Sequence, residues 1–314
     1  MANCGKAKHI SKCLQMAVLF EVSANKPGNV NLVVGFEGTR VEHFLASAVA
    51  AAPIFEEAAR RGIAVAEGKS KMSEVAVGQL IKECVADIAA WQKGGNTLLG
   101  TVILFVPIAV AAGLTPIKGD VFDLVALREN IQLVVESTTA SDAVKLYEAI
   151  DIANPSGLNG APDLDVKNAN SKTRLIKENI SLLKVFKIAA GYDDVCYEWV
   201  NNYPITFDLG YPYLLQQLKT NNLNVAIVNT FLEILSERPD TFISRKIGHA
   251  KASEVSEDAR RVLELGGAGT IQGKEGLKNF DKKLRDSGND YNPGTTADIT
   301  AATLALCILG GYRP

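Results

Sequence analysis

The chain has 314 residues, of which 47% are hydrophobic and 22% charged, as in an ordinary soluble globular protein. This length is enough to bury a large core, and it allows one large domain or two small ones. The formal net charge of −2 gives no bulk positive field, so we expect neither nucleic acid nor a membrane as a partner.

Apolar residues recur at helical spacing along nearly the whole chain. Residues 6–24 form the first such stretch, which ends at the sharp break NKPGNVN, residues 25–31. Residues 39–42 read as a capping box. The helix that this box opens is predicted to run to about Arg61 and to stop at Gly62.

Ser73 is predicted to open the next helix, which ends at the glycine pair 94–95, and a very apolar segment follows from Thr97. Short β-like pieces cannot build a sheet alone. We therefore predict an all-α fold, a single multi-helix domain over residues 1–314 with buried central helices. The remaining predicted helices cover 120–137, 141–153, 173–190, 193–202, 210–219, 223–237, 253–265, 275–286 and 296–309.

Two segments need separate interpretation. Residues 98–114 are uncharged over 17 positions, the lower limit for a membrane span. Pro107 in the middle and Gly100 near the start favour a buried helix instead. Residues 154–172 form the longest segment without a helical pattern, and a loop of that length is either functional or a linker. Helices of similar composition flank it, so we interpret it as a functional loop within one domain.

The cysteines and histidines point to no metal or disulfide framework. The number of cysteines is five, and none forms a C-x-x-C pair, so we expect free thiols in a reducing cytosol. The three histidines are far apart in sequence, which argues against a histidine-rich zinc site. The first ten residues are polar and show no signal peptide. We expect a cytoplasmic protein.

Three glycine-containing breaks carry small polar side chains: KPGN at 26–29, GGNT at 94–97 and NPGTTAD at 292–298. The last two lead directly into very apolar helices. Unpaired N–H groups and the helix dipole at such positions can hold phosphate, and glycine lets the ligand approach the backbone. The alternative is plain helix capping by Thr97 and Thr295.

Four carboxylates accompany these breaks: Glu21, Glu37, Asp240 and Asp298. An anionic cluster can face anionic phosphates only if a hard cation lies between them, and Mg²⁺ usually binds through one or two carboxylates plus substrate phosphates. The alternative for each residue is a solvated surface acid, which is the favoured interpretation of Glu21 taken alone.

Residues 238–254 supply the opposite charge. Asp240 and Thr241 can cap a helix, and Arg245 and Lys246 follow about one turn later. Arginine can bind phosphate oxygens bidentately, whereas lysine acts as a point charge. The alternative is a solvated basic face.

Together these segments resemble the triphosphoribosyl-dephospho-coenzyme A synthase family, and its archaeal branch more than the citrate-lyase operon enzymes of bacteria. The resemblance runs in order over most of the chain. It is carried by EVSANKPGNVN, EHFLASA, GGNTLLG, DTFISRKIG and NPGTTADITAA, of which the last is the most specific.

The resemblance implies an all-α, cytosolic, magnesium-dependent transferase. Well-known members of the family take ATP and dephospho-coenzyme A, move the 5-triphosphoribosyl group onto a ribose 2′-hydroxyl and expel adenine. The link changes from β to α, which suits a single displacement with a carboxylate as base, as in inverting glycoside chemistry.

Carried over residue by residue, the resemblance assigns phosphate or nucleotide binding to Lys26, Gly28, Asn29, Asn96, Thr97, Gly100, Arg245, Lys246, Asn292, Gly294 and Thr295. Compatible roles for the carboxylates are magnesium binding by Asp240, Asp298 and Glu37, and catalysis by Glu37 and Asp298. Which carboxylate is the base and which is the metal ligand stays open.

The chain departs from the family pattern at two positions. Gly38 stands where an aspartate is common, and Leu98 stands where a polar residue often follows GNT. Two alternatives therefore remain: the same fold and triphosphate site acting on a different coenzyme precursor, or a non-catalytic nucleotide-binding or interaction protein. The sequence also leaves open whether the chain forms a homodimer.

Overall fold

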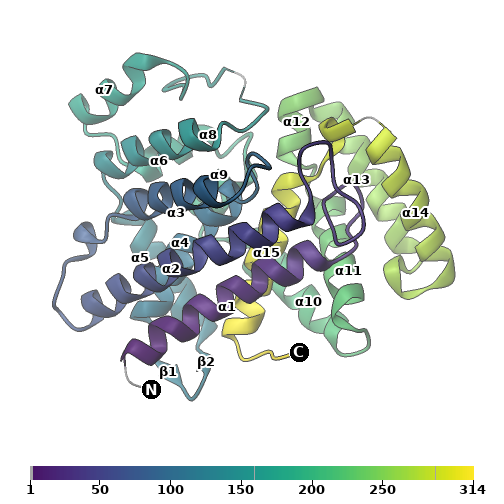
Figure 1. The fold of residues 1–314 in the computed structure, drawn as a ribbon, viewed down its shortest axis with the longest axis horizontal. Coiled ribbons are helices and arrows are strands. Elements are labelled where there is room, and N and C mark those ends of the chain that lie inside the picture. Colours follow the sequence, from purple (N-terminus) through teal and green to yellow (C-terminus); the bar gives the residue numbers. More distant parts are fainter. Residues whose placement is uncertain (1–2, 159, 287) are drawn as a thin grey trace.

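Two apolar helices, α4 (Leu99–Leu114) and α15 (Gly294–Leu309), form the centre of the molecule (Figure 1). Every residue from 101 to 113 is buried, and so is every residue from 299 to 309. A helix that is apolar all round is stable only when other helices surround it. The buried central helices predicted near Thr97 and Thr296 are therefore confirmed.

The computed structural model describes residues 3–158, 160–286 and 288–314, and in these ranges most of the chain is helical. One short antiparallel pair, β1 (Ile117–Lys118) with β2 (Val121–Phe122), is the sheet found there. The prediction of an all-α fold is confirmed. Both termini lie at the lower edge of the view in Figure 1.

The other helices pack around α4 and α15 in two groups (Figure 1). Helix α1 packs on α2 and α15, α2 packs on α4, and α3 packs on α6. Their bounds are α1 (Asn3–Ser23), α2 (Val41–Ala66), α3 (Val77–Trp91), α5 (Leu124–Glu136), α6 (Ala140–Ala153), α7 (Ala169–Lys177), α8 (Leu182–Ala189), α9 (Asp194–Val200), α10 (Tyr211–Leu218), α11 (Leu223–Glu237), α12 (Thr241–Ile247), α13 (His249–Glu264) and α14 (Ile271–Asp286).

The predicted stop of the second helix at Gly62 is wrong, because α2 continues to Ala66. Gly62 faces α4, and a Cβ built there would overlap the carbonyl oxygen of Val110. Gly113 of α4 approaches the backbone of α2 in the same way. The glycine therefore lets two helix backbones pack closely and does not end the helix.

The predicted capping box at residues 39–42 is also wrong. The Thr39 hydroxyl donates to the carbonyl oxygen of Gly94, 2.7 Å away, and ties the loop before α2 to the segment before α4. The reciprocal bond at the start of α2 comes from His43, whose ring nitrogen Nδ1 accepts from the N–H of Arg40 at 3.0 Å.

Further boundaries differ from the sequence prediction. The helix predicted over 120–137 begins only at Leu124, because Val121–Phe122 form β2. The helix predicted from Ser73 begins at Val77, after a single 3-10 turn. The helix predicted over 173–190 is two helices, α7 and α8, because Asn179 between them has a φ of +48°. A residue in the left-handed region cannot continue an α-helix.

The predicted free thiols are confirmed for the four cysteines described as free, all of them buried: Cys13, Cys84, Cys196 and Cys307. Among the described residues, no helix combines the length and the apolar character that a membrane span requires. The apolar segment 98–114 is a buried core helix, as the sequence predicted.

Candidate functional site

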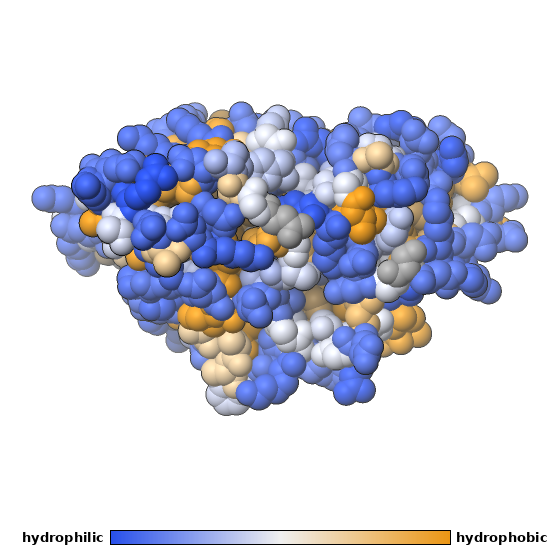
Figure 2. Space-filling view, turned by 90° about the horizontal axis from the view of Figure 1, so that it is seen from above, coloured by the Kyte–Doolittle hydropathy of each residue, from blue (hydrophilic) through white to orange (hydrophobic). Residues whose placement is uncertain are grey.

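A cavity of about 500 Å³ lies where the predicted breaks meet. One end, here called the polar end, is lined by the loop between α1 and α2 and by the first turns of α4 and α15. The other, the apolar end, is lined by α6, α8, α9 and the loop after α6. Figure 2 shows the molecule from above the view of Figure 1. Hydrophobic and near-neutral residues are visible near the middle of this face, with mostly hydrophilic residues on both sides.

Most of the predicted site residues line this cavity although they come from four separate segments of the chain. The central helices α4 and α15 pack with their first turns side by side. This packing brings the segments before the two helices to the same place. The lining includes Asn29, Asn96, Thr97, Gly100, Arg245, Asn292, Gly294, Thr295 and Asp298.

Asp298 lies at the polar end and bonds to the start of α4. Its Oδ1 accepts from the Thr101 hydroxyl at 2.5 Å. Its Oδ2 lies against Gly100, and a Cβ at that glycine would overlap the carboxylate. Because Asp298 is more than one turn inside α15, it does not cap its own helix. The carboxylate instead sits at the positive end of the α4 dipole.

The pKa of Asp298 is raised from 3.8 to about 7, mainly by burial. The bond from Thr101 opposes this shift, and the nearby charge of Glu21 adds to it. A carboxyl group that titrates near neutral pH can both accept and release a proton under ordinary conditions. Asp298 therefore has the protonation behaviour expected of a general base in a cleft.

Glu21 also lines the cavity, so its interpretation as a surface acid is wrong. Its carboxylate is 3.0 Å from the ammonium group of Lys26. Lys26 is fully buried, and it also donates to the backbone carbonyls of Glu21 and Ala24. These contacts hold the ammonium group between the last turn of α1 and the loop that follows. Lys26, predicted to bind phosphate, is outside the cavity lining and fixes Glu21 in place.

Asp240 has different surroundings. Its Oδ1 accepts from the N–H groups of Phe242 and Ile243 at 2.9 and 3.0 Å, which caps α12 as predicted. Its Oδ2 accepts from the N–H and the hydroxyl of Thr296 at 2.7 and 2.8 Å. The residue is 1% exposed. These four bonds occupy the lone pairs of the carboxylate and join α12 to α15. This geometry favours a structural role over the predicted magnesium role.

The capping roles suggested for Thr97 and Thr295 are wrong. The Thr97 hydroxyl shares a hydrogen bond of 2.7 Å with the hydroxyl of Ser47. The Thr295 hydroxyl pairs with that of Thr241 at 3.2 Å. The side-chain oxygen of Asn96 accepts from the N–H of Leu99 and caps α4.

Three other predicted site residues lie outside the cavity lining. Glu37 is exposed on the turn closed by the Phe36–Thr39 bridge. Gly28 has a φ of +66°, and its N–H donates to Asp281. Lys246 donates to the carbonyl oxygen of Asn289 at 2.7 Å. Gly28 and Lys246 thus hold loops around the cavity, and the catalytic role assigned to Glu37 gains no support from its placement.

Arg245 reaches the cavity and forms an ion pair there with Asp193, the residue that caps α9. Sequence reasoning missed Asp193 because an isolated aspartate before a short helix reads only as a cap. It also missed Thr101, the partner of Asp298. Its position four residues after Thr97, directly after the GGNTLLG motif, was the available signal.

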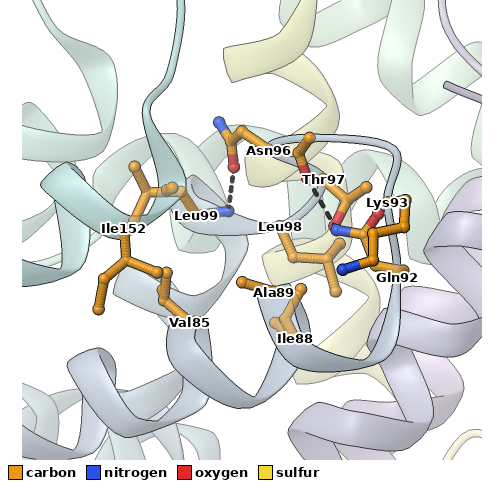
Figure 3. A pocket seen from close by; sticks show the side chains of 12 residues that line it. Val85, Ile88, Ala89, Gln92, Lys93, Asn96, Thr97, Leu98, Leu99 and Ile152 are labelled. Carbon is orange, nitrogen blue, oxygen red and sulfur yellow. Dashed lines mark hydrogen bonds between the residues drawn. The ribbon is translucent and has the colours of Figure 1, made fainter. Parts of the chain in front are cut away.

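A second, smaller cavity of about 230 Å³ lies behind the segment before α4 (Figure 3). Val85, Ile88 and Ala89 of α3 and Ile152 of α6 form its apolar side. Residues 95–99 line both cavities, so the two cavities adjoin the same segment before α4.

The donor set at the polar end fits Mg²⁺ only in part. The described residues contain no group of three histidine, cysteine or acidic side chains that could hold a metal ion alone. Asp298 and Glu21 nevertheless offer carboxylate oxygens at one end of the cavity. This arrangement matches the form in which one or two carboxylates share Mg²⁺ with substrate phosphates.

Comparison with known proteins agrees with the resemblance seen in the sequence. The model of the family described as ATP:dephospho-CoA triphosphoribosyl transferase matches residues 7–314. A crystal structure from Archaeoglobus fulgidus, provisionally assigned as triphosphoribosyl-dephospho-CoA synthase, is similar with a TM-score of 0.63 and 25% identity. The match covers 87% of this chain and 100% of that chain.

Curated relatives match over shorter segments. The 2-(5''-triphosphoribosyl)-3'-dephosphocoenzyme-A synthase of Klebsiella pneumoniae is 32% identical over 88 residues, which is 28% of each chain. A Pseudomonas fluorescens protein described as a probable enzyme of the same name is 30% identical over 105 residues, 33% of this chain and 35% of that one. The matched segments thus span about a third of these relatives.

Proposed function

The chain belongs to the ATP:dephospho-CoA triphosphoribosyl transferase family, and from this premise we propose that it transfers a 5-triphosphoribosyl group from ATP to a hydroxyl acceptor such as dephospho-CoA. The reaction releases adenine and uses Mg²⁺. The observation that carries the proposal is the position of Asp298 in the cavity, with a pKa raised to about 7 and with Gly100 leaving room for its carboxylate.

Asp298 takes the proton of the acceptor hydroxyl in this proposal. The hydroxyl oxygen forms a bond to the anomeric carbon of the donor ribose as the bond from that carbon to adenine breaks, and the leaving adenine takes up a proton from water. A base with a pKa near the working pH is suited to this proton transfer. The Thr101 hydroxyl holds Oδ1 of Asp298 and orients the carboxylate.

The triphosphate lies in this proposal between the first turn of α15, at the polar end, and Arg245 of α12. Arg245 can bind phosphate oxygens bidentately after exchanging its partner Asp193. The first turn of α15, with Gly294 and Thr295 in the lining, adds the positive end of the helix dipole. Mg²⁺, when bound beside Asp298 and Glu21, would neutralise the charge of the triphosphate.

Adenine release from ATP tests the proposal directly. The protein is incubated with ATP and Mg²⁺, with and without dephospho-CoA, and the products are separated by chromatography. Release that requires dephospho-CoA supports the proposal. Release only with another hydroxyl acceptor would show a different coenzyme precursor as substrate, and ATP binding without any release would contradict the enzyme assignment.

A further inference from the structure

The apolar end of the cavity has a composition that the triphosphate does not need. Leu146 and Ile150 of α6 and Val185 and Ile188 of α8 line this end with branched aliphatic side chains. A triphosphate gains nothing from such a surface, because burying charge against aliphatic groups is unfavourable. A second chemical group must therefore account for it.

The loop after α6 covers this end and brings polar groups to it. The hydroxyl of Tyr147 donates to the carbonyl oxygen of Leu164, whose φ of +50° puts it in the left-handed region. At the far side, Gly157 lies close to the side chain of Lys246 on α12. The loop thus reaches across the cavity from α6 to α12. Its Asn154 and Ser156 line the cavity beside the aliphatic groups.

The aromatic residues Tyr147, Phe186 and Tyr192 also line this end. Purine rings are usually bound by stacking on exposed aromatic faces, but Tyr147 and Phe186 are almost fully buried, and Phe186 packs against Trp199. The aliphatic side chains, edged by amide and hydroxyl groups, suit a flexible chain of methylenes and amides. Each buried methylene contributes by the area it removes from water, and amides need hydrogen-bond partners when buried. The pantetheine arm of dephospho-CoA has this composition, with methyl and methylene groups joined by two amides.

We infer that the apolar end of the cavity binds the pantetheine arm of the acceptor. The inference rests on the proposed function, which places the acceptor ribose at Asp298 and the donor triphosphate at the polar end. With the reacting hydroxyl beside Asp298, the arm extends along α6 and α8 under the loop after α6. The arm then contributes affinity and selects dephospho-CoA over shorter nucleotides.

Calorimetry with three ligands tests this inference. Dephospho-CoA carries the arm, ADP has the same adenosine diphosphate without it, and ATP with Mg²⁺ is the donor. The variant is Ile188→Ala. The matched control is Leu183→Ala, a half-buried leucine on the same helix that is outside the cavity lining. Val185→Ala is the second variant in case Ile188→Ala does not fold, as judged by circular dichroism.

We expect Ile188→Ala to weaken dephospho-CoA binding about ten-fold, the scale of losing a few buried methyl and methylene contacts, with ADP and ATP changed less than two-fold. The Leu183→Ala control should behave as the unmodified protein does. Equal losses for all three ligands, no loss for dephospho-CoA, or equal affinity of the unmodified protein for dephospho-CoA and ADP would overturn the inference.

This binding test does not require turnover, so its outcome is separate from that of the proposed function. Arm-dependent binding without adenine release would keep the inference and reject the transfer reaction. Adenine release with dephospho-CoA and ADP as equally good acceptors would keep the transfer reaction and reject the inference.

Discussion

Asp240 and Asp298 lie near the same end of α15, and the sequence suggests magnesium binding for both, but their surroundings differ. Asp240 accepts four hydrogen bonds from α12 and α15 and is 1% exposed. Asp298 bonds to Thr101 and keeps Oδ2 against a glycine that lines the cavity. A carboxylate whose lone pairs are occupied stabilises a fold, whereas one with an oxygen beside a cavity is available for chemistry.

Asp240→Ala should produce the largest change in stability. The substitution leaves the buried N–H groups of Phe242, Ile243 and Thr296 without their acceptor, and each such loss typically costs about 1–3 kcal/mol. We expect the free energy of unfolding to fall by about 3 kcal/mol or more. Denaturant unfolding with Asp298→Ala as the matched variant measures this, and equal losses in the two variants would refute the distinction.

Removal of Mg²⁺ should give the next largest effect. Without a cation, the ionised carboxylate of Asp298 repels the triphosphate, so we expect ATP affinity to fall at least about ten-fold on chelation. Calorimetry with and without EDTA measures the affinity for ATP. Equal affinities would show that the magnesium role given to the polar end is wrong.

Gly100→Ala should affect activity more than stability. The added Cβ overlaps the Asp298 carboxylate, which must then shift, and misplacing a catalytic group by about 1 Å can reduce the rate about 100-fold. We expect at least about a ten-fold loss in kcat at an almost unchanged melting temperature. Gly191→Ala, where a Cβ meets nothing within 4 Å, is the control and should have normal activity. Equal activities of the two variants would disprove the close contact.

The titration of Asp298 should make a smaller contribution, visible as a pH dependence of stability. Its folded pKa of about 7 is above the ordinary value of 3.8, so its stabilising contribution is complete below 3.8 and is lost as the pH rises through 7. Asp298→Asn removes this loss. In EDTA, we expect the free energy of unfolding of the variant to gain about 2–3 kcal/mol over that of the unmodified protein between pH 5 and pH 8. If the difference in the free energy of unfolding between the two proteins is the same from pH 5 to pH 8, the pKa of Asp298 is not raised.

The fold could be predicted from the sequence because α4 and α15 carry apolar residues on every side, which only a helical interior accommodates. The sequence motifs predicted that Asn29, Asn96 and Asn292 would meet at one cavity. They did not predict the hydrogen-bond partners of individual carboxylate oxygens. The sequence shows Asp240 as the cap of α12. Its second hydrogen bond, accepted from the N–H of Thr296 in α15, depends on tertiary packing.

Buried charge was the hardest feature to predict. Lys26 and Glu21 look exposed in a polar stretch, yet they form a buried ion pair where α1 ends. The ion pair of Arg245 with Asp193 likewise joins segments about fifty positions apart, as the sequence separation of 52 shows. Local sequence patterns report which residues start a helix, but not which distant charge each side chain meets.

Adenine release by Asp298→Asn under single-turnover conditions tests the central claim most directly. The amide keeps the shape of the side chain but cannot accept the hydroxyl proton. We predict a rate at least about 100-fold below that of the unmodified protein, with dephospho-CoA as acceptor and a fold at least as stable. Release at the normal rate by a folded Asp298→Asn protein would contradict the account.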